Sequence, residues 1–558
     1  MSARDLGYTS RMNQSNQRLL MLVATLCLAA CSRSDPVVVS GDPVPQGMGA
    51  INLEQGWSAS IQEKSWFTTF GSRLMPYEWF LALEQPHASA PFRDLRHMAA
   101  FGLLNAGPSM LNPDGLPVGF TQDTDPNGKR WVGLGCAACH TGQVMIDAQA
   151  VRLDGGQSLF DFQRFEDSVI KALSATVSDD DKFARFANAL NVAETEQISL
   201  RNALVARAQK MRNVQRTNQT PVPYGPGRLD AFGQIFNAVG VQFLESPANR
   251  HVPDAPVSFP VLWSAPHLDL VQWNGSAPNA GPGPLFQNVT TALAVFGELE
   301  ITGHNAKLGY PSSVHFDNLG RIQEWLYALK SPRWPKDLLE QPEAKSVKRG
   351  EQVYAQHCES CHAITDRDDP KRKVKVALTP VDVVGTDARM VNNFLEATAA
   401  SGRFEGQKLA VFAGPTLERR AQSIDLVVHA ATGATLRHPL KAARAAAQGY
   451  HKVYKDQIDQ HPDYYKARSL DGIWASAPYL HNGSVPTLAD LLLTPDERPT
   501  RFPISHHFDA TRVGLNTGIT SDAQFDTALP GNSNAGHVFG TELPPPSKTD
   551  LLNFLKTL

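Results

Sequence analysis

Apolar and polar positions recur with helical spacing in three segments of the chain. Residues 347–362 carry apolar side chains that can share one helix face, and residues 318–329 and 548–558 follow the same pattern. A Pro-bounded stretch, residues 331–335, follows the second of these segments and is incompatible with a continuing helix. The pattern therefore predicts helices in these three segments and a domain boundary near residue 340.

The remaining chain is rich in residues that favour loops. Its 558 residues include 41 Gly and 39 Pro, and residues 221–283 are dense in Pro, Gly, Asn and Trp. Long loops in a compact domain are often functional. The hydrophobic content of 42% and charged content of 19% exclude a disordered chain, a coiled coil and a multi-span membrane protein. The formal net charge of −3 gives no electrostatic reason to expect nucleic-acid binding.

The N-terminus has the pattern of an export signal. The apolar run Leu19–Ala30 follows three Arg residues and is shorter than the roughly 20 residues that span a bilayer. It ends in Leu28-Ala29-Ala30-Cys31, which resembles a bacterial lipobox, so cleavage before Cys31 and lipidation of its thiol are expected. An ordinary signal cleaved elsewhere is the alternative. Ser32 in place of Asp favours sorting of the lipoprotein to the outer membrane, on the periplasmic side of the cell envelope.

The other cysteines of the exported chain fall into two copies of one motif. Residues 136–140 read Cys-Ala-Ala-Cys-His and residues 358–362 read Cys-Glu-Ser-Cys-His. The C-x-x-C-H pentapeptide is typical of c-type haem attachment: the thiols bond to the porphyrin and the imidazole ligates the iron. Thioredoxin-like redox pairs do not require the trailing His, and a zinc site shared over more than two hundred residues is disfavoured. We therefore expect two covalent haems, held by Cys136, Cys139, Cys358 and Cys361, with His140 and His362 as proximal ligands.

The motifs and helices together predict a mainly α fold. Opening and closing helices that pack across each other around a haem are the pattern of a cytochrome c module. The predicted organisation is a signal peptide (1–30), a tether (31–60), an N-terminal cytochrome c-like haem domain (61–340) and a C-terminal one (341–558), with long loop-rich insertions.

The two modules resemble the bacterial di-haem cytochrome c peroxidase superfamily, which includes the methylamine-utilisation di-haem enzymes. Residues 469–488 are similar to the signature of that superfamily's second domain, and Trp273-Asn274-Gly275 resembles its Trp-Asp-Gly element, whose Trp lies between the two haems. Residues 72–84 and 531–537 look most like the di-haem rubber oxygenase branch. The resemblance implies that Trp273 relays electrons, with Trp263 as the fallback. It also implies a calcium ion between the domains, for which no ligands can be assigned.

The sixth ligand of the C-terminal haem is expected to be His537. It lies in a Gly/Asn/Ser-rich loop that allows close backbone approach, and the rubber oxygenase branch has a bis-His second haem. Met390 is the second candidate, because the classical peroxidases use Met there. His481, within the superfamily signature, is expected to shape the haem pocket or the contact between domains.

The N-terminal haem lacks an evident sixth ligand. The first His after His140 is His251, 111 positions later, whereas the classical peroxidases carry a distal His soon after this motif. Residues 274–297 also contain no Asp, Glu, His, Lys or Arg, although the classical enzymes place a Glu there to move protons. This pattern favours an open haem that holds O₂ or an apolar substrate over efficient peroxide cleavage.

Three functions remain open at this point. The first is a peroxidase-like di-haem oxidoreductase, in which a small donor protein (a cytochrome or a cupredoxin) reduces the C-terminal haem. Electrons then pass to an N-terminal haem that activates H₂O₂ or O₂. The second is a haem dioxygenase that cleaves an apolar olefin, and the third is a non-enzymatic electron-transfer cytochrome. We favour the first, in a protein bound to the membrane through its lipid anchor.

Overall fold

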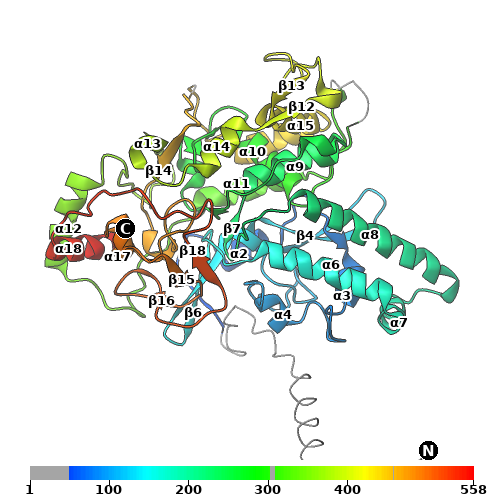
Figure 1. Cartoon of the computed structure of the whole chain (residues 1–558), viewed down its shortest axis with the longest axis horizontal. Coiled ribbons are helices and arrows are strands. Elements are labelled where there is room, and N and C mark those ends of the chain that lie inside the picture. The colour runs from blue at the N-terminus through cyan, green and yellow to red at the C-terminus, as the bar shows by residue number, and fades with distance from the viewer. Residues whose placement is uncertain (1–48, 302–307, 457) are drawn as a thin grey trace, which may run out of the picture. The chain divides into compact units, whose positions relative to one another are not determined.

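The computed structural model describes residues 49–301, 308–456 and 458–558, which are coloured in Figure 1. The predicted leader, the lipidation site Cys31 and most of the tether lie outside the described residues. The described residues group into a single compact unit.

Helices make up 39% of the described residues and strands 15%, so the expected mainly α class is wrong and the fold is mixed α/β. The strands are only two to six residues long and lie in segments rich in Pro, Gly and polar residues. Strands of that length are too short to show a period-two alternation, which is the signal that distinguishes a strand in a sequence. Short strand pairing was therefore hidden in segments that read as loops.

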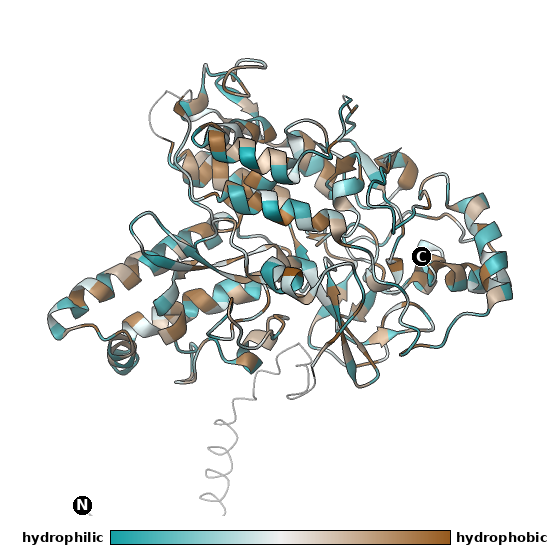
Figure 2. Cartoon of the chain, turned by 180° about the vertical axis from the view of Figure 1, so that it is seen from behind, coloured by the Kyte–Doolittle hydropathy of each residue, from teal (hydrophilic) through white to brown (hydrophobic). Residues whose placement is uncertain are grey.

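The α-helices, many of them amphipathic, are α2 (Ala59–Phe67), α3 (Tyr77–Ala82), α4 (Leu95–Ala99), α5 (Cys136–His140), α6 (Phe162–Ser178), α7 (Asp180–Ala189), α8 (Gln197–Thr217), α9 (Ala231–Asn237), α10 (Gly283–Ala294), α11 (Phe316–Ala328), α12 (Ala344–His357), α13 (Val381–Val384), α14 (Arg389–Glu396), α15 (Ser423–Leu436), α16 (Pro439–Gly449), α17 (Leu488–Leu491) and α18 (Pro545–Leu555). Figure 2 shows hydrophilic and hydrophobic residues interspersed along them. Within the described ranges, no helix is both long enough and apolar enough to cross a membrane.

The strands form small, separate sheets. Two are three-stranded, in the orders β1-β6-β5 and β2-β4-β3, and the others are two-stranded. The bounds are β1 (Ile51–Asn52), β2 (Met75–Pro76), β3 (Phe120–Thr124), β4 (Arg130–Leu134), β5 (Thr141–Ile146), β6 (Gln149–Asp154), β7 (Arg228–Leu229), β8 (Val257–Ser258), β9 (Leu270–Val271), β10 (Ala277–Pro278), β11 (Ala377–Pro380), β12 (Thr398–Ala400), β13 (Arg420–Gln422), β14 (Tyr464–Ala467), β15 (Arg501–Pro503), β16 (Phe508–Asp509), β17 (Gly514–Leu515) and β18 (Gln524–Asp526).

The two three-stranded sheets hold the first motif between them. Strand β4 ends one residue before Gly135, the motif helix α5 follows, and β5 begins directly after it and pairs antiparallel with β6. Gly119 lies against the motif with a φ of +87°, and a Cβ on it would meet the amide nitrogen of Ala138 at 2.1 Å. Only glycine permits this approach, so the β3 end of the sheet fixes the position of α5.

The second motif lies at the end of α12, which packs across the C-terminal helix α18 as the sequence predicted. A Cβ on Gly350 would meet the carbonyl oxygen of Asp550 at 2.0 Å, so the two backbones are in direct contact. The Asp550 carboxylate accepts hydrogen bonds from the Ser346 hydroxyl at 2.6 Å and from the Arg349 guanidinium at 2.7 Å. These contacts fix the helix that carries the second motif.

Segments from both sides of residue 340 share hydrophobic cores. Helix α11 packs on α16, where a Cβ on Gly320 would lie 2.8 Å from the Cα of Ala445, and α10 packs on α15. One core contains Phe236 and Phe316 together with Phe394 and Tyr450. The predicted domain boundary near residue 340 stays a prediction. Helices from before and after this position nevertheless pack in the same core.

Candidate functional site

The second motif presents its histidine to a cavity. Cys358 directly follows the last residue of α12, and the amide of His362 donates to the Cys358 carbonyl at 2.8 Å in a tight turn. The Nδ1 of His362 lies 2.7 Å from the carbonyl oxygen of Arg468. A carbonyl accepts only, so Nδ1 carries the proton and Nε2 keeps its lone pair for a metal.

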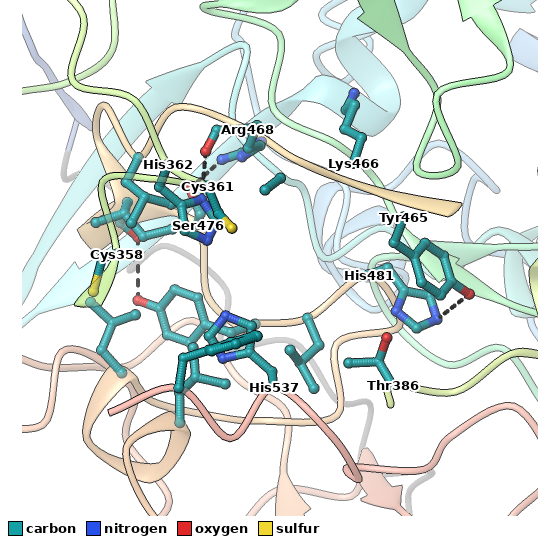
Figure 3. A pocket seen from close by; sticks show the side chains of 18 of the residues that line it. Cys358, Cys361, His362, Thr386, Tyr465, Lys466, Arg468, Ser476, His481 and His537 are labelled. Atoms are coloured by element: carbon teal, nitrogen blue, oxygen red, sulfur yellow. Dashed lines mark hydrogen bonds between the residues drawn. The ribbon is translucent and has the colours of Figure 1, made fainter. Parts of the chain in front are cut away.

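A cavity of about 260 Å³ opens beside this motif (Figure 3). Cys358, Cys361, His362, Trp273 and His537 all contribute to its wall, and most of the remaining lining is aliphatic or aromatic. The sequence predicted that Cys358, Cys361, His362 and His537 share one haem and that Trp273 lies between two haems. The structure places all five residues in the wall of this cavity, and the haem roles stay predictions.

His537 faces His362 across the cavity. Their ring centroids are 6.3 Å apart, with 49° between the ring planes. Two imidazoles on opposite faces of one metal ion need about this separation, since each metal–nitrogen bond is roughly 2 Å and each ring centroid lies about 1.2 Å beyond its nitrogen. Burial, with a smaller contribution from His362, lowers the pKa of His537 to about 4, so the ring is neutral at pH 7. The buried Nδ1 of His537 has no hydrogen-bond partner within the described ranges.

The loop that carries His537 is held by Arg498. The Arg498 guanidinium donates to the carbonyl oxygens of Asn534 at 2.6 Å, Gly536 at 2.8 Å and His537 at 3.0 Å. The backbone of His537 has a φ of +46°, and its amide donates to the carbonyl of Val384 at 2.8 Å. A left-handed backbone is uncommon at a non-glycine residue, and here it is held by hydrogen bonds. The loop therefore positions the ring with little freedom.

Met390, the alternative ligand, lies elsewhere. It is buried on α14 in a small core with Ala255, Val391 and Tyr465, and it is not part of the cavity wall. His481 does line the cavity. Its ring stacks on Tyr465 with centroids 4.3 Å apart, and its Nε2 lies 3.0 Å from the Tyr465 hydroxyl.

The first motif repeats the local arrangement of the second. The Nδ1 of His140 lies 2.8 Å from the carbonyl oxygen of Pro260, and burial lowers the pKa of His140 to about 4. Cys136 and Cys139 are free thiols whose pKa values burial raises to about 11 and 12. Both motifs thus offer two thiols and one imidazole that is oriented by a backbone carbonyl.

The surroundings of His140 differ from those of His362. In the described part of the chain, the aromatic ring paired with His140 is Phe259, with centroids 6.3 Å apart, and not a second imidazole. A cavity of only about 20 Å³ lies beside the motif, and Trp57, Ile322 and Trp325 are among the residues of its wall. The Nδ1 of each motif histidine therefore has a backbone carbonyl as its partner. The aromatic neighbour differs: it is Phe259 for His140 and His537 for His362.

Polar groups that the sequence did not reveal lie near the first motif. The buried hydroxyl of Tyr450 accepts from the Asn288 amide at 2.7 Å, and the same amide donates to Gln323 at 3.2 Å. Burial raises the pKa of Tyr450, and Cys136 is close enough to add to the shift. These side chains come from α10, α11 and the end of α16. Tyr450 and Gln323 lie outside residues 274–297, and Asn288 is not ionisable, so the absence of ionisable groups in that segment gave no sign of this cluster.

Trp273 connects the two motif regions. Its indole Nε1 donates to the carbonyl of Ser258 at 3.1 Å, and its own carbonyl accepts from the Lys466 amide at 3.0 Å. Two residues after Ser258, the carbonyl of Pro260 accepts from His140. The segment 258–260 therefore contacts both the indole at the C-terminal cavity and the first motif histidine. Trp263, the fallback, is fully buried and donates to the Asp471 carbonyl at 2.9 Å, as a core residue does.

No ligands were assigned for the calcium ion implied by the resemblance. Across residues 49–301, 308–456 and 458–558, no group of three or more His, Cys, Asp or Glu side chains is arranged to hold a metal ion.

Part of the C-terminal region is similar to a cytochrome c-like domain. A model of the family described as RoxA-like, cytochrome c-like matches residues 464–503, which include Arg468, His481 and Arg498. This match supports the resemblance to the rubber oxygenase branch and indicates a haem oxidoreductase, while the wider superfamily rests on the motifs alone.

The whole chain has relatives in Sinorhizobium fredii. It is 31% identical to the uncharacterized protein y4iJ over 575 aligned positions, which cover 91% of this chain and 93% of y4iJ. It is also 25% identical to the uncharacterized protein y4iM over 57% of this chain and 65% of y4iM. The chain belongs to the family of y4iJ.

Proposed function

We propose that this protein is a di-haem c-type oxidoreductase of the peroxidase-like type, in which a C-terminal haem supplies electrons to an N-terminal haem that activates H₂O₂ or O₂. One observation carries the proposal. Each motif histidine has its Nδ1 close to a backbone carbonyl oxygen, but among the residues that the structure describes only His362 faces a second imidazole. A haem with both axial positions filled suits electron transfer, and one with an open position suits binding of an oxidant.

In this proposal His362 and His537 would be the residues that ligate the iron of the C-terminal haem. The carbonyl of Arg468 sets the tautomer and orientation of His362, and Arg498 fixes the loop of His537. When bound, such a group supplies one-electron chemistry at an iron that keeps its ligands. A ligand set that does not change between oxidation states keeps structural rearrangement small during electron transfer.

Trp273 would carry electrons between the two haems. It lines the C-terminal cavity and bonds to the segment that also binds His140, so the path from one motif to the other follows its indole and residues 258–260. His140, held by Pro260, would ligate the N-terminal haem on one side. Phe259 and the apolar side chains near the motif limit the access of water.

A second candidate is a haem dioxygenase that cleaves an apolar olefin. The RoxA-like family match and the apolar side chains around the first motif favour it. The two candidates differ in the oxidant and in the need for external electrons. A peroxidase consumes a reduced donor with H₂O₂, and a dioxygenase consumes O₂ and olefin alone.

The experiment uses the purified holoprotein with a small reduced cytochrome or cupredoxin. Donor oxidation that depends on H₂O₂ supports the peroxidase-like reading. Oxygen uptake that depends on an added olefin and needs no donor supports the dioxygenase. Two low-spin haems that bind neither cyanide nor CO would contradict both and leave an electron-transfer cytochrome.

We also propose that the protein is anchored on the periplasmic side of the outer membrane through a lipid on Cys31. The lipobox-like sequence and Ser32 support this location, which would place the C-terminal haem within reach of small soluble electron carriers.

A further inference from the structure

Two cationic side chains lie in the wall of the C-terminal cavity. Lys466 is on β14 and Arg468 follows the end of that strand, and both line the cavity. Residues two apart on an extended segment point to the same side. Figure 3 shows Arg468 beside His362 and Cys361, and Lys466 farther from Cys358, on the side of Tyr465.

Neither cation has a carboxylate partner. Within the described ranges, no hydrogen bond or ion pair involves the Lys466 ammonium, and the Arg468 guanidinium makes one hydrogen bond, to the Ser476 hydroxyl at 3.3 Å. The nearest acidic groups are engaged elsewhere. Asp269 accepts from the amides of Leu270 and Val376, and Asp471 accepts from the Thr365 hydroxyl.

Burial disfavours the charge on Lys466. It lowers the pKa of Lys466 to about 7, with Arg468 adding to the shift. Two like charges beside an apolar cavity are unfavourable unless an anion compensates them. The charge pattern of this wall therefore calls for an occupant with carboxylate groups.

We propose that Lys466 binds a propionate carboxylate of the haem attached at the second motif, an inference that rests on the proposed function. A haem carries its vinyl groups and its propionates on opposite edges. The cysteines receive the vinyl edge, and Lys466 lies farther from Cys358, on the side of Tyr465. The site is a cationic cradle that orients the cofactor and offsets its negative charge.

The cradle also lies next to the relay residue, because the Lys466 amide donates to the Trp273 carbonyl at 3.0 Å. Strand β14 would therefore hold the propionate edge through the Lys466 side chain and the tryptophan through the Lys466 backbone. Loss of the ammonium leaves a carboxylate uncompensated. An uncompensated carboxylate stabilises the ferric form, so the midpoint potential of the C-terminal haem falls.

The test compares Lys466→Met, Lys466→Arg and Lys375→Met holoproteins by spectroelectrochemical titration of the low-spin haem. Lys375 is an exposed lysine and serves as the charge-matched control. We expect a lower midpoint potential in Lys466→Met only, with the wild-type value in Lys466→Arg and Lys375→Met. If Lys466→Met does not accumulate, Lys466→Gln replaces it with the same expected fall.

Two further measurements separate the alternatives. Pyridine haemochrome analysis counts the haems first: fewer than two per wild-type chain overturns the proposed function itself. If the wild-type chain holds two haems but the midpoint potential of the low-spin haem is the same in Lys466→Met and Lys375→Met, the proposed role of Lys466 is wrong and the proposed function stands. Acetate added to the wild-type holoprotein should leave the potential unchanged, because the haem's own carboxylates occupy the cradle. A shift with acetate would assign the site to an external carboxylate and overturn the proposal.

Discussion

The imidazole rings of His362 and His537 face each other across one cavity, with their centroids 6.3 Å apart. They are separated by 175 positions in the sequence, and the Arg498 contacts to the His537 loop bring them together. This pair distinguishes the second motif from the first.

Replacement of His537 should open the C-terminal haem. In His537→Ala we expect one low-spin haem to become high-spin and to bind CO, because one axial position loses its nitrogen. Electron paramagnetic resonance and CO difference spectra measure this. Met390→Leu is the matched control, since Met390 packs in a separate core. An unchanged low-spin signal in His537→Ala, or its loss in Met390→Leu, would show that the ligand is assigned wrongly.

Replacement of Trp273 should slow electron transfer between the haems. Trp273→Phe keeps an aromatic ring in the cavity wall but removes the N–H that donates to Ser258. We expect both haems to stay bound and the rate of inter-haem transfer, followed by stopped-flow after reduction of one haem, to fall several-fold. Trp263→Phe, in the core, should leave that rate unchanged. Equal rates in wild type and Trp273→Phe would rule out the relay.

The sequence predicted the chemistry of the site better than its surroundings. The spacing of nearby residues was sufficient to recognise the two C-x-x-C-H motifs. The amphipathic pattern was sufficient to predict the helices α12 and α18. The prediction that His537 faces His362 needed a resemblance as well, because a lone histidine in a loop has no local signal.

Other features had no signal in the sequence. The backbone carbonyls of Pro260 and Arg468 orient the motif histidines, and any residue type can supply a carbonyl. Tyr450 approaches Cys136 only through tertiary packing of α16 on α11. Short strands such as β11 and β14 were missed because pairing between distant segments, and not local alternation, creates them.

The packing of α12 on α18 should be sensitive to a single methyl group. Gly350→Ala places a Cβ 2.0 Å from the Asp550 carbonyl oxygen, so the helices must separate. We expect a loss of about 1–3 kcal/mol in the free energy of unfolding, although Ala favours a helix over Gly by about 1 kcal/mol. Urea denaturation measures it. Gly49→Ala, with no atom near the added Cβ, is the control. Equal stability of the two variants would show that the helices are not in contact.

The same helix pair should lose stability in acid. The Arg349 guanidinium and the Ser346 hydroxyl hold the pKa of Asp550 below its usual range. Because the folded-state pKa is the lower one, this contribution is present above the unfolded pKa of about 4 and is lost as the pH falls through the folded value. Urea midpoints between pH 6 and pH 3 should therefore fall more steeply for wild type than for Asp550→Asn. Parallel curves would assign the acid sensitivity to other groups.

The lipid anchor can be tested independently of the haems. Cys31→Ser should move the protein from the membrane fraction to the soluble fraction and abolish labelling by radioactive palmitate. Cys27→Ser, which changes a cysteine inside the predicted leader, should leave both unchanged. Palmitate labelling that persists in Cys31→Ser would place the lipid elsewhere or exclude it.

The central claim is an unequal pair of haems on one chain. The measurement that tests it most directly is the electron paramagnetic resonance spectrum of the oxidised holoprotein, with its haem content set by pyridine haemochrome analysis. The account predicts two haems per chain, one low-spin with bis-imidazole ligation and one high-spin that becomes low-spin when cyanide is added. Fewer than two haems, or two low-spin haems that cyanide leaves unchanged, would contradict it.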